Sequence, residues 1–139
     1  MTNEIKNNLF QCIAINKEFG SVRANDDISI NVKSSQIHAL LGENGAGKST
    51  LVKIIYGLLQ ADSGSMTFLN NEFSPKSPKD ARALGVGMVF QHFSLFEPLT
   101  AFENIILGLD KELCEKELSE SVIKLSESYG LEVNLSSFI

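Results

Sequence analysis

Short stretches in the first two thirds of the chain alternate between hydrophobic and polar residues or are continuously hydrophobic, and both patterns predict β-strands. The predicted strands are Leu9–Ile15, Asp27–Val32, Gln36–Leu41, Ser65–Leu69 and Val86–Phe90. Asn16–Gly20 is predicted to be a turn, and Asn70-Asn71 is typical of a hairpin turn from which Glu72-Phe73 pairs back. The two strands before Gln36 predict a small antiparallel layer ahead of a parallel core.

Helical spacing and capping residues predict the remaining elements. Leu51, Ile54, Ile55 and Leu58 fall on one face of a helix. Ser77-Pro78-Lys79-Asp80 begins a short helix that runs to Leu84 and ends at Gly85. Thr100 and Glu103 form a capping box for a helix that closes at Gly108. A second, acidic helix begins near Asp110 and carries its apolar face on Cys114, Leu118, Val122, Leu125 and Tyr129.

The stretch Gly42–Thr50 reads Gly-Glu-Asn-Gly-Ala-Gly-Lys-Ser-Thr and fits the phosphate-binding loop pattern G-x-x-x-x-G-K-[ST]. It follows a predicted strand and opens a predicted helix, which is the context that the pattern requires. Glycines allow successive backbone N–H groups to approach a phosphate, and the new helix adds its unpaired N–H groups and the positive end of its dipole. The alternative is a glycine-rich turn with a surface lysine.

The residue types in this loop assign roles. Lys48 is placed to reach the β- and γ-phosphates, and the Ser49 hydroxyl is placed to ligate Mg²⁺, a cation that takes oxygen ligands. The predicted phosphate-binding residues of the loop are Gly42, Asn44, Gly45, Ala46, Gly47, Lys48, Ser49 and Thr50.

Composition and charge narrow the class of protein. A chain of 139 residues with 43% hydrophobic and 21% charged residues is typical of a globular domain or part of one. The net charge of −5 lies within residues 101–139, because acidic and basic residues balance in residues 1–100. This distribution argues against a nucleic-acid surface. Cys12 and Cys114 have no metal or redox spacing, and the N-terminus lacks a signal-peptide pattern, so a cytoplasmic location is predicted.

Other phosphate-loop classes need motifs that this sequence lacks. A GTPase needs N-K-x-D after the loop, whereas Asn16-Lys17 precedes it. A small-molecule kinase would be expected to supply arginine clamps, and after Lys48 the chain has only Arg82.

The sequence resembles the ATP-binding subunits of ABC transporters. The resemblance rests on Leu41–Leu51, Ala61–Gly64, Gly85–Phe93 and Leu99–Gly108, and it covers about residues 9–130. His38–Leu41 and Gln91-His92-Phe93 are most similar to the importers of simple sugars and nucleosides. The resemblance implies an α/β fold of the ABC-type P-loop NTPases, with residues 9–91 forming the β layer and P-loop core and residues 92–139 beginning a helical subdomain.

The resemblance also implies site residues and partners. Phe19 corresponds to the aromatic that stacks on adenine, and Gln91 to the glutamine that can offer its oxygen to Mg²⁺. The implied cofactors are ATP and Mg²⁺. The implied partners are a membrane permease, a second ATP-binding domain and, indirectly, an extracytoplasmic solute-binding protein, which would place the chain on the inner face of the membrane.

Departures from the family pattern limit the expected activity. The chain has no Leu-Ser-Gly-Gly-Gln signature, and Ile105–Asp110 only superficially resembles a Walker B strand because a capping box precedes it. We therefore expect an incomplete domain that does not hydrolyse ATP alone. Strands that flank Gln36–Leu41 in the family would come from sequence not present here, which predicts unpaired backbone and exposed apolar faces. A non-catalytic nucleotide-binding module and an ABC ATPase without a transport role remain alternatives.

Overall fold

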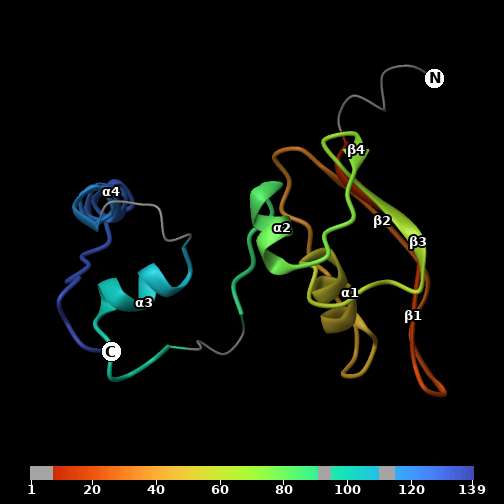
Figure 1. Cartoon of the computed structure of the whole chain (residues 1–139). Coiled ribbons are helices and arrows are strands. Elements are labelled where there is room, and N and C mark those ends of the chain that lie inside the picture. The colour runs from red at the N-terminus through yellow and green to blue at the C-terminus, as the bar shows by residue number, and fades with distance from the viewer. Residues whose placement is uncertain (1–7, 91–94, 110–114) are drawn as a thin grey trace. The chain divides into compact units, whose positions relative to one another are not determined.

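The structure is a computed structural model that describes residues 8–90, 95–109 and 115–139. The chain divides into two compact units, Met1–Val89 and Phe90–Ile139. Figure 1 shows a sheet with two helices in the first unit and two further helices in the second.

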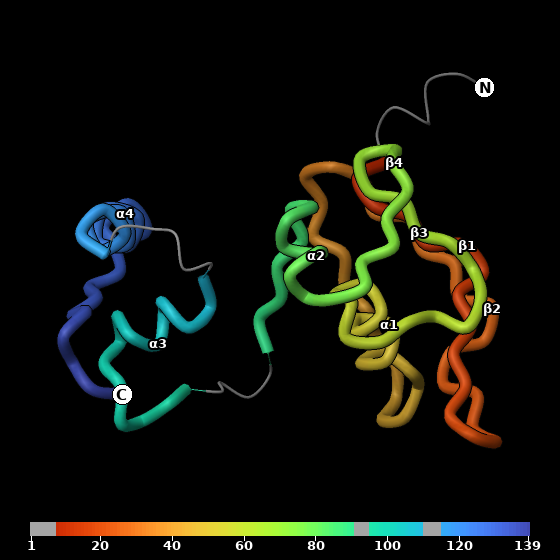
Figure 2. Tube along the Cα trace, in the orientation of Figure 1, coloured from red at the N-terminus to blue at the C-terminus, as the bar shows by residue number. Residues whose placement is uncertain are grey.

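A four-stranded sheet forms the first unit. Its strands are β1 (Asn8–Phe19), β2 (Val22–Lys33), β3 (Ser63–Phe68) and β4 (Asn71–Glu72), in the order β2-β1-β3-β4. Every neighbouring pair is antiparallel, which confirms the predicted antiparallel layer. Figure 2 shows β1 and β2 as a long hairpin. Cys12 and Ile15 of β1 form one buried apolar cluster with Leu51 and Ile54, and Ile28 and Ile30 of β2 pack against it.

The first strand is longer than predicted, so the expected turn at Asn16–Gly20 was wrong. Lys17, Glu18 and Phe19 pair with Asn25, Arg23 and Val22 across the hairpin. The turn falls at Gly20-Ser21, where Gly20 has a φ of 60°. The sequence pattern missed this extension because polar cross-strand contacts, described below, hold residues 16–19 in the sheet. The later hairpin turn is also displaced by one residue, since Phe68 pairs with Asn71 across Leu69-Asn70.

Two helices pack on the sheet, and both confirm the sequence pattern. α1 (Lys48–Ile55) buries Leu51 and Ile54 against Cys12 and Ile15 of β1. The helix ends before Leu58, which is exposed. α2 (Pro78–Ala83) begins at Ser77, whose hydroxyl accepts a hydrogen bond from the backbone N–H of Asp80.

A second apolar cluster lies beside the first. Phe73 is buried between the rings of Phe10 and Phe68, with centroid distances of 6.0 and 5.8 Å, and packs with Tyr56 and Ala81. Burying aromatic rings of this size contributes much of the stability of a small core. These contacts fix α1 and α2 relative to the sheet within the first unit.

Two predicted strands, Gln36–Leu41 and Val86–Phe90, are absent from the described sheet, and their prediction was wrong for this structure. Ile37 is fully exposed, and Leu41 and Val89 are 87% and 86% exposed. A strand requires a neighbouring strand for its backbone hydrogen bonds, and neither segment pairs with a strand of the described sheet. The sequence encodes the local preference of these segments but not the presence of their partner strands.

The second unit contains α3 (Ala101–Leu107) and α4 (Glu115–Ser128). The capping box predicted at Thr100 and Glu103 is present, and Gly108 caps the C-terminus of α3. Ile105–Leu107 therefore lie in a helix, as the sequence indicated, rather than in a Walker B strand. Backbone bonds from Ala101 and Phe102 to Ser137 and Leu135 tie the C-terminal residues to α3.

Among the described residues, none of the helices has the length and apolar content needed to span a membrane.

Candidate nucleotide-binding site

The loop between residues 42 and 47 leads directly into α1. Gly45 and Gly47 have φ values of 86° and 78°, a conformation that residues with a Cβ rarely adopt. Gly47 is the N-cap of α1. The backbone N–H of Ala46 donates to the Glu43 carbonyl at 3.2 Å, which closes the loop into a tight turn. The glycines therefore allow the backbone to fold back over the start of the helix.

The N-terminus of α1 is left open for an anion. Gly47 supplies no side-chain cap, and the first turn contains no acidic residue. The first helical hydrogen bond runs from the Leu51 N–H to the Gly47 carbonyl at 3.0 Å, so the N–H groups of Lys48, Ser49 and Thr50 precede the regular helical ladder. Such N–H groups and the positive end of the helix dipole together favour phosphate.

Lys48 lies inside the loop. Its Nζ donates to the carbonyls of Gly42 at 2.7 Å and Glu43 at 2.6 Å. A Cβ on Gly42 would lie 3.3 Å from the Ala46 Cβ and 3.8 Å from the Lys48 Nζ, so a side chain there would crowd the cradle. Lys48 is half-buried and Ser49 is exposed. The loop thus brings an ammonium group, a hydroxyl and free backbone donors to one place.

The second strand supports this loop from behind. A Cβ on Gly47 would lie only 2.0 Å from the Ala24 carbonyl oxygen, so only glycine fits against β2 at this point. Asn25 of β2 is 3% exposed, and its Nδ2 donates to the Gly47 carbonyl at 3.2 Å. Its Oδ1 is buried without a hydrogen-bond partner among the described residues. Asn25 is therefore held in place beside the start of α1 although burial of its free oxygen is costly.

Phe19 lies at the end of β1, and its side chain is 47% exposed. The Lys17 Nζ lies 5.6 Å from the centroid of the Phe19 ring. Lys17 pairs across the hairpin with Asn25, which contacts Gly47. The predicted aromatic platform and the phosphate loop are therefore connected through two neighbouring strands of the same hairpin.

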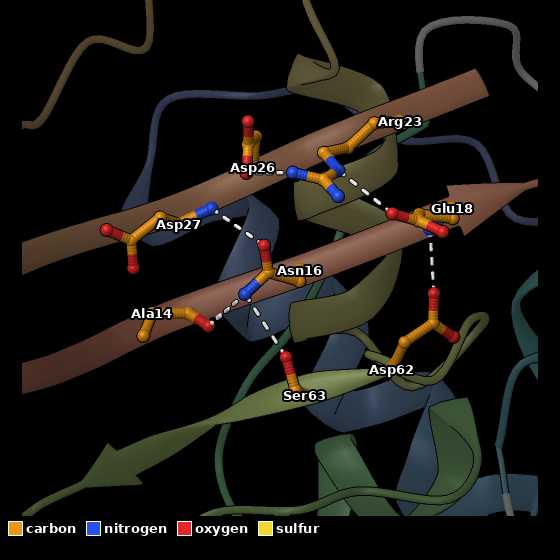
Figure 3. A network of polar contacts seen from close by, with 8 residues as sticks. All are labelled: Ala14, Asn16, Glu18, Arg23, Asp26, Asp27, Asp62 and Ser63. Atoms are coloured by element: carbon orange, nitrogen blue, oxygen red, sulfur yellow. Dashed lines mark hydrogen bonds and ion pairs between the residues drawn. The ribbon is translucent and has the colours of Figure 1, made fainter. Parts of the chain in front are cut away.

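Figure 3 shows a network of polar contacts that joins β1, β2 and the chain at Asp62-Ser63. Asp62 accepts a hydrogen bond from the Glu18 backbone N–H at 2.7 Å and pairs with the Lys17 ammonium at 2.6 Å. Both interactions stabilise the charged carboxylate, the Lys17 bond most, and they lower the pKa of Asp62. Arg23 binds Glu18 and Asp26 at 2.9 and 3.0 Å, and these carboxylates raise the pKa of its guanidinium.

Asn16 joins the hairpin to β3. Its Nδ2 donates to the Ala14 carbonyl at 2.9 Å and to the Ser63 hydroxyl at 3.1 Å. Its Oδ1 accepts from the Asp27 backbone N–H at 2.9 Å. Ala14 and Asp27 have positive φ values where the pairing register shifts, so Asn16 stabilises an irregular part of the sheet.

The structure groups most of the predicted site residues. Gly42 and Asn44–Thr50 lie together in the loop and the first turn of α1, and Phe19 is linked to them through β1 and β2. Gln91 and His92 lie outside the described residues. The open helix end, the paired glycines and the inward-facing Lys48 fit a triphosphate, and the exposed Ser49 hydroxyl suits a magnesium ion that also binds phosphate oxygens.

Sequence reasoning missed three residues near this site. Asn25 lies in a polar stretch that looks solvent-exposed, and Lys17 lies in the wrongly predicted turn. Asp62 lies in Ala61–Gly64, which contributes to the family resemblance but contains no predicted site residue. Their roles depend on partners distant in sequence, so no local pattern points to them.

Comparison with known proteins gives a consistent assignment. The family model described as "ABC transporter" matches residues 25–138. The chain is 41% identical over 130 residues to the guanosine import ATP-binding protein NupO of Bacillus subtilis, which covers 91% of this chain and 26% of that protein. It is 39% identical over 136 residues to the ribose import ATP-binding protein RbsA of Hahella chejuensis, which covers 94% and 27%.

A solved structure agrees in fold. The crystal structure of a nucleotide-free ATP-binding cassette from an ABC transporter superposes with a TM-score of 0.81 at 28% identity, over 94% of this chain and 57% of that one. The chain thus spans about a quarter of the length of these curated relatives and about half of the solved cassette. With the family model matching most of its length and with a phosphate loop at the start of α1, the chain belongs to the ABC transporter family.

Proposed function

We propose that this chain binds Mg-ATP through the loop formed by residues 42–50. The observation that carries the proposal is the N-terminus of α1, which has no side-chain cap and follows two glycines at positive φ, in a loop whose carbonyls bind the Lys48 ammonium. Lys48 would exchange its bonds to the loop carbonyls for phosphate oxygens, a stronger charge-assisted interaction. Ser49 would hold the magnesium ion, together with Gln91, and Phe19 would stack on the adenine.

The wider role that we propose is that of an importer ATPase. The relatives named above are import ATP-binding proteins for guanosine and ribose, which supports a sugar or nucleoside as the transported solute. Residues 9–91 would carry the nucleotide, and residues 92–139 would begin the helical subdomain that contacts a membrane permease. Two such domains would enclose ATP, and an extracytoplasmic binding protein would deliver the solute. In this role the chain would lie on the inner face of the membrane.

Hydrolysis by the 139-residue chain alone is not expected. The sequence contains neither a signature motif nor a Walker B aspartate followed by a glutamate. Without a general base to activate water, bound ATP would remain intact. The coupled reaction, ATP hydrolysis driving uptake, would require those groups.

The Lys48→Ala variant tests nucleotide binding. Titration of the 139-residue chain with Mg-ATP by isothermal calorimetry should show affinity reduced at least about tenfold, because a phosphate-facing cation is lost. Lys53→Ala, an exposed lysine in the last turn of the same helix, is the matched control and should bind normally. Equal affinity of Lys48→Ala and the original chain would refute the proposal.

A non-catalytic nucleotide-binding module remains the alternative function. It predicts the same ATP binding but no permease, so co-purification of the chain with a membrane permease in its native host would exclude it. Turnover of ATP by the pure chain, abolished by Lys48→Ala, would instead show that the expectation of inactivity is wrong.

A further inference from the structure

We infer that Asp62 and Lys17 form a clamp that positions Phe19 for the nucleotide base. This inference rests on the proposed function, since it assigns a role to residues around the proposed adenine platform. Neither residue belongs to the phosphate loop or to its supporting contacts at Gly47.

The Asp62 carboxylate binds two groups of β1, one through each oxygen. One oxygen accepts from the Lys17 ammonium at 2.6 Å and the other from the Glu18 backbone N–H at 2.7 Å. The Asp62 backbone N–H donates to the Asn16 carbonyl at 2.9 Å. Asp62 therefore contacts three successive residues of β1, the ones that lead directly to Phe19.

β1 is irregular where Asp62 contacts it. The pairing of β1 with β2 shifts register between Ile15 and Lys17 and again between Lys17 and Glu18. Irregular strand ends are weakly specified by the ladder alone, because each shift removes regular hydrogen bonds. The Asp62 bonds supply what the ladder lacks, and they fix the backbone direction from which the Phe19 side chain extends.

The clamp also contacts the aromatic ring of Phe19 directly. The Lys17 ammonium lies 5.6 Å from the ring centroid, within the range of a cation–π contact. Lys17 is held there by Asp62, and its side chain is only 15% exposed. Nearly half of the Phe19 surface remains exposed. The clamp covers part of the ring and leaves the rest available for a stacked base.

A surface ion pair alone contributes little to stability, so the clamp is not explained well as a stabilising salt bridge. The clamp instead fixes the orientation of Phe19. An aromatic platform held in one position loses less conformational freedom when a base stacks on it, and pre-organisation of this kind increases affinity. Asp62 and Lys17 are thus positioning residues, and Phe19 is the group that touches the ligand.

The test compares two ligands that differ in whether they reach Phe19. Affinities of the 139-residue chain for Mg-ATP and for inorganic tripolyphosphate with Mg²⁺ are measured by calorimetry. Asp62→Ala removes both side-chain contacts that orient Phe19, so it should weaken Mg-ATP binding about three- to tenfold and leave tripolyphosphate binding within about twofold. Lys17→Met, which keeps the length of the side chain without its charge, should act in the same direction.

Two further variants separate positioning from general damage. Lys33→Ala removes the charge of an exposed lysine at the other end of the same hairpin, where Lys33 pairs with Asn8, and it should leave both affinities unchanged. Asp62→Asn keeps an acceptor for the Glu18 N–H but loses the ion pair, so it should fold normally and show a smaller loss for Mg-ATP. In a Phe19→Ala background, Asp62→Ala should have no additional effect, because the two act as a unit.

These measurements distinguish failure of the clamp from failure of nucleotide binding by the loop of residues 42–50. Equal weakening of both ligands by Asp62→Ala and Asp62→Asn would overturn the clamp, as would unchanged Mg-ATP affinity in both. If Phe19→Ala leaves Mg-ATP affinity unchanged, the clamp is also overturned, whereas nucleotide binding by the loop stands. Binding of Mg-ATP or of tripolyphosphate that is insensitive to Lys48→Ala counts against the loop itself.

Discussion

The buried amide of Asn25 supports the phosphate loop through Gly47, but burying its unpaired oxygen costs folding free energy. Its Nδ2 donates to the Gly47 carbonyl, but that carbonyl also accepts the first helical bond from Leu51. Removing the amide would therefore leave no unsatisfied group on the loop. It would also remove the Oδ1 atom that is buried without a partner among the described residues.

This balance predicts the effect of Asn25→Leu, a replacement with the same number of non-hydrogen side-chain atoms. The free energy of unfolding, measured by urea denaturation, should stay within about 1 kcal/mol of the original or rise, because a buried unsatisfied oxygen is replaced by an apolar group. Asn25→Asp is the contrasting variant and should lose on the order of 3 kcal/mol, since it buries a charge beside a carbonyl. A larger loss for Leu than for Asp would contradict this account.

At the scale of elements, what could be predicted from the sequence depends on how far away the stabilising partners lie. The phosphate loop, α2 and α3 begin and end where their caps and glycines indicated, because N-caps act within three or four residues. Asn25 and Asp62 are placed by contacts with residues more than twenty positions away. The extension of β1 depends on Asp62 and also on the nearby pairing of Glu18 with Arg23 across the hairpin. Gln36–Leu41 shows the limit clearly, since its strand-like pattern alone does not create a ladder.

The capping box of α3 makes a pH-dependent prediction. The Glu103 carboxylate accepts from the Thr100 backbone N–H at 2.7 Å and from its hydroxyl at 2.8 Å, and these bonds, the backbone one first, lower the pKa of Glu103. A lowered folded-state pKa stabilises the fold above the unfolded pKa of about 4.3, and this contribution is lost as pH falls through the folded value.

Glu103→Gln should therefore reduce the thermal stability of α3 (Ala101–Leu107) at pH 7. The loss should disappear as the pH falls through the folded pKa of Glu103, because the original carboxylate then becomes neutral as well. Circular dichroism at 222 nm during heating provides the measurement. Glu127→Gln is the matched control on α4, because the Glu127 carboxylate accepts none of the hydrogen bonds seen among the described residues. If the original chain and Glu103→Gln differ in thermal stability by the same amount in acid as at pH 7, the charge of Glu103 is not the cause of the difference.

At the scale of the whole chain, the apolar residues left without partners dominate the expected behaviour. Ile37 and Leu41 precede the phosphate loop and Val89 follows α2, and all three are largely or fully exposed within the first unit. Segments that are both apolar and capable of strand pairing are sites of association in any protein that exposes them. The net charge opposes this only weakly, because it lies within residues 101–139.

The isolated chain should accordingly self-associate as its concentration rises, and sedimentation velocity would detect this. Ile37→Lys and Val89→Lys should each reduce the association, since a charge disfavours burial against a second copy. Val22→Lys changes an exposed valine of the β1–β2 hairpin outside these segments and should leave association unchanged. If all three variants reduced association equally, added charge rather than the location of the apolar residue would be the cause. A chain that stays monomeric throughout would mean that Gln36–Leu41 and Val86–Phe90 are covered in solution by contacts within the chain itself.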